Sequence, residues 1–407
     1  MNCRHCAQPL THPFLDLGHA PPSNAYLTAA DLVHPEKYFP LKVMVCSNCW
    51  LVQTEDYAKA DELFSADYAY FSSTSTSWLR HAEAYATAMT QRLGLSGKSL
   101  VVEVASNDGY LLRNFVAAGI PCLGIEPTAS TAAASELLGI PTLREFFGEA
   151  LGKRLAGEGR KADLIAGNNV YAHVPDINDF TKGLATLLKP DGVITLEFPH
   201  LLNLIRMGQF DTVYHEHYSY LSLSAVRRIF AHAGLRIFDV EEISTHGGSL
   251  RIYGCLDAAP HQAMPSVAQV LKDEQDAGLE KLETYAAFQS RADKIKNDFV
   301  FFLIEAKREG KKVVAYGAAA KGNTLMNYGG VKPDLLPLVY DAAAAKQGKF
   351  MPGSHVPIHA PQTLRDTEPD YVVILPWNIA AEVMSTLKPM LPAKAKFVSA
   401  VPEMQFR

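Results

Sequence analysis

The sequence predicts an α/β protein with two regions of parallel β-sheet. Short apolar runs alternate with helical stretches from about residue 99 to residue 255, and again from residue 312 onward. Such alternation is typical of parallel sheets with helices on both faces. The length of 407 residues suits two or three domains, at about 150 residues for each domain. Hydrophobic residues make up 48% and charged residues 20%, which is the composition of a folded globular chain.

The charge of the chain argues against nucleic acid as a partner. There are 38 basic and 43 acidic side chains, so the formal net charge is −5, and the basic residues form no block. Affinity for a phosphate backbone comes mainly from clustered Lys and Arg. No apolar run approaches the roughly 18 residues of a membrane-spanning helix, and the N-terminal residues show no signal-peptide pattern. We therefore expect a cytoplasmic protein that binds neither nucleic acid nor membranes.

The first 60 or so residues are rich in proline and show little periodicity, so they need a staple to fold. They contain two C-x-x-C pairs, Cys3 with Cys6 and Cys46 with Cys49. Four thiolates are the ligand number of a tetrahedral zinc site, and a site closed by four thiolates has no open position for substrate. A redox pair would sit at a thioredoxin-like strand–helix boundary, which neither pair does. We predict one structural zinc ion, with free or redox-active cysteines as the alternative.

The central region predicts a parallel sheet with one irregular edge. A helix is expected over residues 78–93, and another over 180–188. Strands are expected at residues 99–104, 122–125, 162–166 and 192–197. Residues 235–240 and 249–254 are two further strands separated by a Gly247-Gly248 turn and no helix. They should pair antiparallel at the edge of the sheet.

The last part of the chain predicts connecting helices and a second α/β unit. Residues 264–309 are polar and charged, with Gly278 as their only glycine, and predict one or two long helices. A strand over 312–316, a turn over 317–322 and a helix follow. Further strands are expected at residues 336–340, 371–375 and 396–399.

A ligand site is predicted where the first central strand ends. The turn Ala105-Ser106-Asn107-Asp108-Gly109 follows that strand and opens a helix, so its backbone N–H groups can approach a ligand closely. Glu126 ends the next strand, where a carboxylate can accept hydrogen bonds from ribose hydroxyls. The turn departs from the dinucleotide pattern G-x-G-x-x-G. With the antiparallel strand pair, it resembles a class I S-adenosylmethionine methyltransferase; another Rossmann-like cofactor domain is the alternative.

A second cluster of reactive side chains lies in the segment Asp211–Tyr218, which contains Tyr214, His215, Glu216 and His217. His-x-His can present two imidazoles to a metal ion from one strand face. Alternatively, a histidine that titrates near neutral pH can act as an acid or base, positioned by Tyr or Glu. A third interpretation is a set of satisfied polar residues at an interdomain surface. The residues alone leave all three open.

The second α/β unit carries its own candidate site. Small residues and Lys321 lie between its first strand and first helix, where backbone donors and one cation suit a pyrophosphate. Asp341 ends the following strand, where an acidic side chain would meet a ribose. The alternative is a tight helix–strand turn with a surface lysine.

In this order, these features resemble the sugar-nucleotide C-methyltransferases that make branched deoxysugars. The match spans essentially the whole chain and includes six stretches: residues 67–73, 103–109, 168–174, 214–217, 246–251 and 346–353. The resemblance implies a small zinc-binding domain (1–60), a class I methyltransferase domain with a Rossmann-like fold (61–257), connecting helices (258–310) and a second Rossmann-like domain that binds the sugar nucleotide (311–407).

The resemblance also implies the reaction. Such enzymes methylate C3′, the carbon next to the keto group of a nucleotide-linked 4-keto-deoxysugar, and dTDP is the expected nucleotide. His217 is expected to remove the C3′ proton and Tyr214 to donate to the enolate oxygen. Glu216 and His173 are expected to orient them. An unactivated C–H bond does not attack a methyl group, so both a base and an enolate stabiliser are required.

The remaining expectations concern binding. S-adenosylmethionine is expected to contact residues from four segments: Tyr68, Tyr70, Ala105, Asn107, Asp108, Gly109, Glu126 and Asn169. The nucleotide is expected between the central and C-terminal domains, with its diphosphate near Lys321, which would take no part in the chemistry, and with Asp341 also binding substrate. The run Ala342–Ala345 departs from the polar residues of relatives. We expect a monomer or weak homo-oligomer. O- or N-methylation of a small metabolite, or a non-catalytic zinc-stabilised nucleotide-binding protein, are the alternatives.

Overall fold

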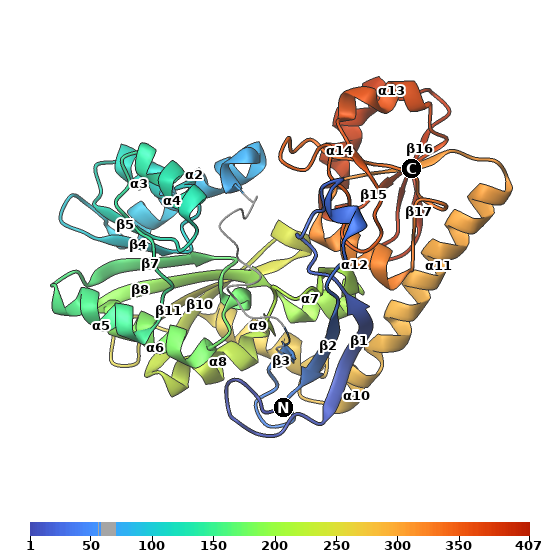
Figure 1. Cartoon of the computed structure of the whole chain (residues 1–407). Coiled ribbons are helices and arrows are strands. Elements are labelled where there is room, and N and C mark those ends of the chain that lie inside the picture. The colour runs from blue at the N-terminus through green and yellow to red at the C-terminus, as the bar shows by residue number, and fades with distance from the viewer. Residues whose placement is uncertain (56, 58–70) are drawn as a thin grey trace.

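The computed structural model describes residues 1–55, 57 and 71–407. Tyr68 and Tyr70, two of the expected cofactor contacts, lie outside the described residues. Three sheets organise the described chain, with strand orders β1-β2-β3-β9, β10-β11-β8-β7-β4-β5-β6 and β14-β13-β12-β15-β16-β17. Figure 1 shows the seven-stranded sheet on the left, the six-stranded sheet at the upper right, and strands β1 and β2 between and below them.

The N-terminal sheet is antiparallel and is better ordered than its composition suggests. Its strands are β1 (His12–Ala20), β2 (Phe39–Val45), β3 (Val52–Thr54) and β9 (Ser219–Tyr220). Phe14 and Val43 of these strands are buried in one cluster with Phe288 and Phe299 of the helix α11 (Phe288–Arg308). The apolar partners of this segment therefore lie more than 200 residues away, where periodicity within the first 60 residues cannot reveal them.

The central sheet has the predicted form. Its strands are β4 (Val101–Val104), β5 (Cys122–Ile125), β6 (Thr142–Leu143), β7 (Ala162–Asn168), β8 (Leu188–Pro199), β10 (Leu235–Ile243) and β11 (Ser249–Leu256). The first five pair in parallel, whereas β11 pairs antiparallel with both β8 and β10. The predicted antiparallel pair thus forms the edge of the sheet. The chain order reverses at β4, which lies between β5 and β7, and ligands bind at the carboxyl ends of strands at such a point.

Helices cover both faces of the central sheet. Figure 1 shows α2 (Thr76–Leu93), α3 (Leu112–Ala117) and α4 (Ala129–Leu137) above it, and α5 (Glu149–Gly157), α6 (Ile177–Leu187) and α8 (Leu223–His232) below it. Side chains of Ser75, Asp176 and Ser222 cap the backbone N–H groups that begin α2, α6 and α8. The short α7 (Leu201–Arg206) follows β8.

Three helices lead to the C-terminal sheet: α9 (Pro265–Asp276), α10 (Leu282–Ala286) and α11. The sequence predicted one or two long helices here, and α11 is the long one. The Glu274 carboxylate of α9 accepts hydrogen bonds from the backbone N–H groups of Leu223 and Ser224, at 2.5 and 2.9 Å, and so caps α8 from a distant helix. No helix in the described part of the chain is long and apolar enough to cross a membrane.

The C-terminal sheet is parallel except for its last strand. It consists of β12 (Val313–Tyr316), β13 (Val339–Tyr340), β14 (Ile358–His359), β15 (Tyr371–Ile374), β16 (Lys396–Ser399) and β17 (Gln405–Phe406). Its helices are α12 (Ala320–Tyr328), α13 (Leu364–Thr367) and α14 (Ala380–Leu387). Because α12 begins at Ala320, Lys321 lies in the first helical turn rather than in the predicted loop.

Candidate functional site

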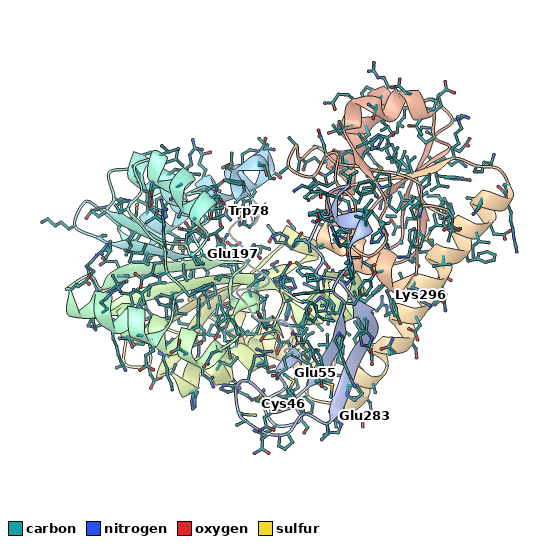
Figure 2. All side chains as sticks on the ribbon, viewed as in Figure 1. Cys46, Glu55, Trp78, Glu197, Glu283 and Lys296 are labelled. Atoms are coloured by element: carbon teal, nitrogen blue, oxygen red, sulfur yellow. The ribbon has the colours of Figure 1, made fainter. Side chains whose placement is uncertain are left out.

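The four N-terminal cysteines meet at one point. Their Sγ atoms all lie within 4.8 Å of one another, and the Cys3–Cys49 and Cys6–Cys46 pairs are each 3.5 Å apart. A tetrahedral site with metal–sulfur distances of about 2.3 Å separates its sulfurs by about 3.8 Å. The cluster therefore has the size of a zinc tetrathiolate, and it lies at the lower end of the molecule in Figure 2, where Cys46 is labelled.

Each cysteine pair ends in the same backbone turn. The N–H groups of Ala7 and Trp50 donate to the carbonyls of Cys3 and Cys46, both at 2.9 Å, and both donors have a left-handed φ, of 61° and 62°. The repeated turn directs the two sulfurs of each pair toward a common centre. Gln53 of β3 donates to the Cys3 sulfur at 3.2 Å, so the sheet orients the ligands from outside.

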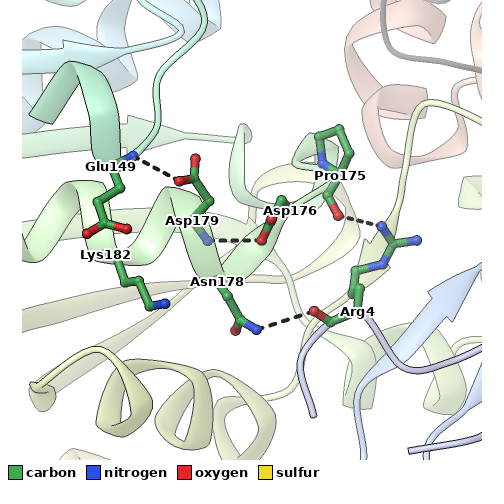
Figure 3. A pocket seen from close by; sticks show the side chains of 7 residues that line it. All are labelled: Arg4, Glu149, Pro175, Asp176, Asn178, Asp179 and Lys182. Carbon is green, nitrogen blue, oxygen red and sulfur yellow. Dashed lines mark hydrogen bonds between the residues drawn. The ribbon is translucent and has the colours of Figure 1, made fainter. Parts of the chain in front are cut away.

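The cysteine region is docked on the central sheet beside α6. Arg4 donates to the carbonyl of Pro175 at 2.8 Å, and Asn178 Nδ2 donates to the His5 carbonyl at 2.8 Å. A polar hollow of about 500 Å³ lies next to this contact. Figure 3 shows Arg4 beside Pro175 and Asn178 among the residues that line it. Pro175 lies two residues after His173, so the cysteine region fixes the loop that carries this histidine.

The predicted cofactor turn follows β4 with a strained backbone. Ala105, Asn107 and Gly109 have φ values of 57°, 50° and 78°. A Cβ at Gly109 would lie 2.5 Å from Ile140 Cδ1, so this position requires glycine. Left-handed residues other than glycine are uncommon and gather at functional sites, which agrees with a turn shaped for close approach to a ligand.

Glu126 braces this turn. Its two carboxylate oxygens accept hydrogen bonds from the backbone N–H groups of Asn107 and Thr128, at 3.0 and 2.8 Å. The side chains of Asn107 and Asp108 in turn accept from the backbone of Ser72 and Ser73, at 2.9 and 3.0 Å. A ribose at Glu126 would therefore meet a carboxylate that is already held in position.

The turn fits a polar ligand such as S-adenosylmethionine. The buried oxygens Asp108 Oδ1, Ser106 Oγ and Asn169 Oδ1, and both polar atoms of the Asn168 side chain, have no hydrogen-bond partner among the described residues. Buried polar groups are almost always paired in a folded protein. These atoms follow β4 and β7, which are neighbouring strands, and so offer partners to a polar group bound there.

His246 contacts Asn169, the residue after β7, and the sequence analysis gave His246 no role. Asn169 Nδ2 donates to His246 Nε2 at 3.1 Å, and both residues have a φ of 54°. Figure 2 labels Trp78 and Glu197 at this end of the central sheet. The Trp78 ring lies 5.5 Å from the His246 ring. The stretch 246–251, which contains His246, was the signal that could have identified this residue.

The geometry of His217 is that of a base. Its Nδ1 donates to the carbonyl of Thr212 at 3.0 Å, which places the proton on Nδ1 and leaves the lone pair on Nε2. Burial, with a contribution from the neighbouring His173, holds the pKa of His217 well below its usual range. At neutral pH the ring is therefore uncharged and able to accept a proton.

The other residues predicted to be catalytic surround His217 in different ways. The Tyr214 and His173 rings lie 4.0 and 4.7 Å from the His217 ring, between centroids. His173 Nδ1 donates to the Glu216 carbonyl at 2.8 Å, and burial lowers the pKa of His173 to about 4. The Glu216 carboxyl accepts from Asn24 at 2.7 Å, and burial raises its pKa to about 7. The hydrogen bond that orients the His217 ring is thus accepted by the Thr212 carbonyl, whereas the Glu216 carboxyl bonds to Asn24.

His215 is directed away from His217. Its Nε2 lies 3.3 and 3.2 Å from the carbonyls of Phe39 and Pro40, so its ring packs on the N-terminal sheet. His215 therefore anchors the segment 211–217 to the N-terminal sheet.

The two residues predicted to bind substrate lie in different networks. The carboxylate of Asp341 accepts from the backbone N–H groups of Ala318 and Ala343, both at 2.7 Å, so it braces the turn after β12 as Glu126 braces the turn after β4. Lys321 Nζ instead donates to Asn378 Oδ1 at 3.1 Å and lies 4.6 Å from the centre of the Trp377 ring. Trp377 and Asn378 carried no signal in the sequence.

Known protein families match all three regions of the chain. Family models match a zinc-binding domain at residues 3–64, a methyltransferase domain at 78–240 and a C-methyltransferase C-terminal domain at 244–402. The C-methyltransferase NovU of Streptomyces niveus is 33% identical over 401 residues, which cover 98% of this chain and 95% of NovU. The chain belongs to this C-methyltransferase family. It is therefore an enzyme that transfers a methyl group from S-adenosylmethionine to carbon.

Two solved methyltransferase structures are similar to part of this C-methyltransferase. Magnesium protoporphyrin IX methyltransferase from Synechocystis PCC 6803 is 16% identical, with 43% of this chain and 78% of that chain covered and a TM-score of 0.33. A methyltransferase from Clostridium acetobutylicum ATCC 824 is 12% identical, with 44% and 92% covered and a TM-score of 0.36.

Zinc should be bound by this C-methyltransferase at close to one ion per chain. Cys46→Ser should abolish zinc binding and destabilise the N-terminal sheet, because three thiolates cannot close the tetrahedral site. Elemental analysis and thermal unfolding measure both effects. Cys255→Ala, a buried cysteine outside the cluster, should keep the zinc. A metal-free protein that is folded and fully active would contradict the assignment.

Replacing Glu126 by Ala should weaken binding of S-adenosylmethionine roughly ten- to a hundredfold, since a charge-assisted hydrogen bond is worth about 1.5–3 kcal/mol. Calorimetry with S-adenosylhomocysteine measures the change. Glu136→Ala, an exposed carboxylate on the adjacent helix α4, is the matched control and should bind normally. Equal affinity in the two variants would place the ribose elsewhere.

Proposed function

We propose that this C-methyltransferase methylates C3′ of a nucleotide-linked 4-keto-deoxysugar, with His217 as the base. The observation that carries the proposal is the state of His217: buried, uncharged, with Nδ1 hydrogen-bonded and Nε2 available. Oxygen and nitrogen nucleophiles bring their own lone pair, whereas a carbon nucleophile must be generated. A C–H bond next to a ketone is acidic enough for a positioned imidazole to do so.

The proton transfer follows from this arrangement. His217 Nε2 takes the C3′ proton, and the electron pair of the C–H bond becomes the C3′–C4′ double bond of an enolate, with its charge on the keto oxygen. Tyr214, which lies against the His217 ring, is proposed to donate a hydrogen bond to that oxygen. His173, which is proposed to help to orient the base, packs edge-on against the His217 ring and is itself held by the Glu216 carbonyl. The protonated His217 later returns its proton to solvent.

Residues that follow three neighbouring strands are proposed to hold the methyl donor. They are Ala105, Asn107, Asp108 and Gly109 after β4, Glu126 after β5 and Asn169 after β7, with Tyr68 and Tyr70. Bound S-adenosylmethionine supplies an electrophilic methyl group, which the enolate carbon takes as the carbon–sulfur bond breaks toward sulfur. The hydrogen bond between Asn169 and His246 supports this placement, because it joins the donor side to the acceptor side of the site.

The nucleotide is proposed to lie between the central and C-terminal sheets, with dTDP as the expected nucleotide. The support is that α12, the first helix after β12, packs directly on residues 211–217, here called the catalytic segment. Thr324 Oγ1 of α12 donates to the Val213 carbonyl at 2.8 Å. A ligand bound at the carboxyl end of β12, where Asp341 holds the turn, would therefore reach toward His217.

The substrate class is tested with a panel of dTDP-, GDP- and UDP-linked 4-keto-deoxysugars and labelled S-adenosylmethionine. His217→Asn should bind cofactor and substrate normally and lose about 10²–10⁴ in turnover, the usual contribution of a general base. With S-adenosylhomocysteine bound, the wild type should exchange the C3′ proton with deuterated solvent and the variant should not. His215→Asn is the control, because its ring faces β2, and it should still catalyse exchange. Exchange that persists in His217→Asn would remove His217 from the role.

The pH profile provides a separate test. A base whose folded pKa is depressed stays uncharged as pH falls through 6.5, the ordinary value for histidine, and loses activity only when pH falls through the lower value. We therefore expect no loss of kcat/KM from protonation of His217 between pH 7 and pH 6.5. Glu216→Gln removes a carboxyl whose pKa is about 7, and this variant should show the same dependence of kcat/KM on pH as the wild type. A wild-type loss centred near pH 7 that disappears in Glu216→Gln would make Glu216 the titrating group.

A further inference from the structure

Two charged side chains, Asp211 and Lys321, accompany the segment that carries His217, and the proton transfer described above uses neither of them. Asp211 is 1% exposed; its Oδ2 accepts a hydrogen bond from Trp377 Nε1 at 2.7 Å. The ammonium of Lys321 lies over the ring of the same tryptophan. Lys321 comes from α12 of the C-terminal region, whereas Asp211 begins the segment that carries His217.

The position of α12 directs Lys321 toward the base. Thr324, three residues after Lys321, donates to the carbonyl of Val213. Residues three apart lie on the same face of a helix, so Lys321 projects from the face that packs on the catalytic segment. Burial is the main cause of the lowered pKa of both His217 and His246, and the positive charge of Lys321 adds to it. Its ammonium therefore shares their water-poor surroundings.

The charges of Lys321 and Asp211 are suited to one kind of ligand group. Burial lowers the pKa of Lys321 to about 8 and raises that of Asp211 to about 6. At pH 7 an ammonium and a carboxylate are therefore present together. A diphosphate placed here would meet the buried negative charge of Asp211. A neutral ketone that becomes negative only during the reaction meets an available N–H donor, since Asn378 accepts the one hydrogen bond that Lys321 Nζ makes among the described residues.

We propose that Lys321 contacts the keto group of the substrate, rather than its diphosphate, and stabilises the enolate that His217 generates. This inference rests on the proposed function and assigns a different part of the substrate to Lys321. Asp211, Trp377 and Asn378 are then positioning residues: they hold the ammonium and act on the substrate only through it. The C-terminal region would supply one group of the reaction as well as the nucleotide site.

The test separates a contact to the ketone from a contact to the diphosphate. Turnover, KM and C3′ deuterium exchange are measured for the wild type, Lys321→Met and Lys321→Arg, and the affinity for dTDP alone is measured by calorimetry. Loss of one enolate-stabilising donor should lower turnover and exchange about 10²-fold or more in Lys321→Met, while the Kd for dTDP changes less than about threefold. Lys321→Arg keeps the charge and should recover at least about tenfold of the loss.

Lys332→Met is the matched control. Lys332 follows α12 at its other end and bonds to the carbonyl of Gly353, so this variant removes a positive charge from the same region without touching the site. Its turnover, exchange and dTDP affinity should equal those of the wild type. If Lys321→Met does not fold, Lys321→Gln provides the same comparison.

Three results would overturn the inference: turnover of Lys321→Met within about threefold of the wild type, a loss of dTDP affinity with unchanged exchange, or an Arg variant as slow as the Met variant. The proposed function fails on a different result, namely that the wild type methylates none of the sugar nucleotides and exchanges none of their C3′ protons.

Discussion

The segment from Asp211 to His217 is held by the N-terminal sheet, by helix α12 and by a hydrogen bond of its own, and the rest of the site depends on this. Its backbone carbonyls are buried and must find donors. Thr54 of the N-terminal sheet donates to the His217 carbonyl at 3.1 Å, and Thr324 of the C-terminal helix α12 donates to the carbonyl of Val213. Within the segment, the Thr212 carbonyl accepts from His217 Nδ1 and thereby fixes the tautomer of that imidazole.

Removing water from this segment sets the charges of its side chains. Histidines are held neutral and Glu216 is held near its point of titration, because burial penalises each charged form. The same low-dielectric surroundings strengthen any hydrogen bond to a charge that develops during a reaction. A resting site whose histidines are neutral is therefore suited to chemistry in which an uncharged group becomes an anion.

The sequence was informative where local chemistry determines structure. The ligand count of the cysteine pairs, the strands of the central sheet and its antiparallel edge all follow from residues close together in the chain. It was less informative where distant segments meet. The strands β1 and β2 depend on apolar side chains of α11, and the partners of Glu216 and Lys321, which are Asn24 and Asn378, lie on separate elements. The Thr212 carbonyl accepts the hydrogen bond of the His217 imidazole, and a backbone carbonyl has no sequence signature.

Strand β9 links the metal site to the segment that carries His217. Ser219 and Tyr220 pair with Gln53 and Val52 of β3, and the Gln53 side chain bonds to the sulfur of Cys3. Ser219 lies two residues after His217. The cysteine cluster and the segment that carries His217 therefore share one continuous sheet, so that loss of the metal would disturb the backbone that leads from His217 into β9.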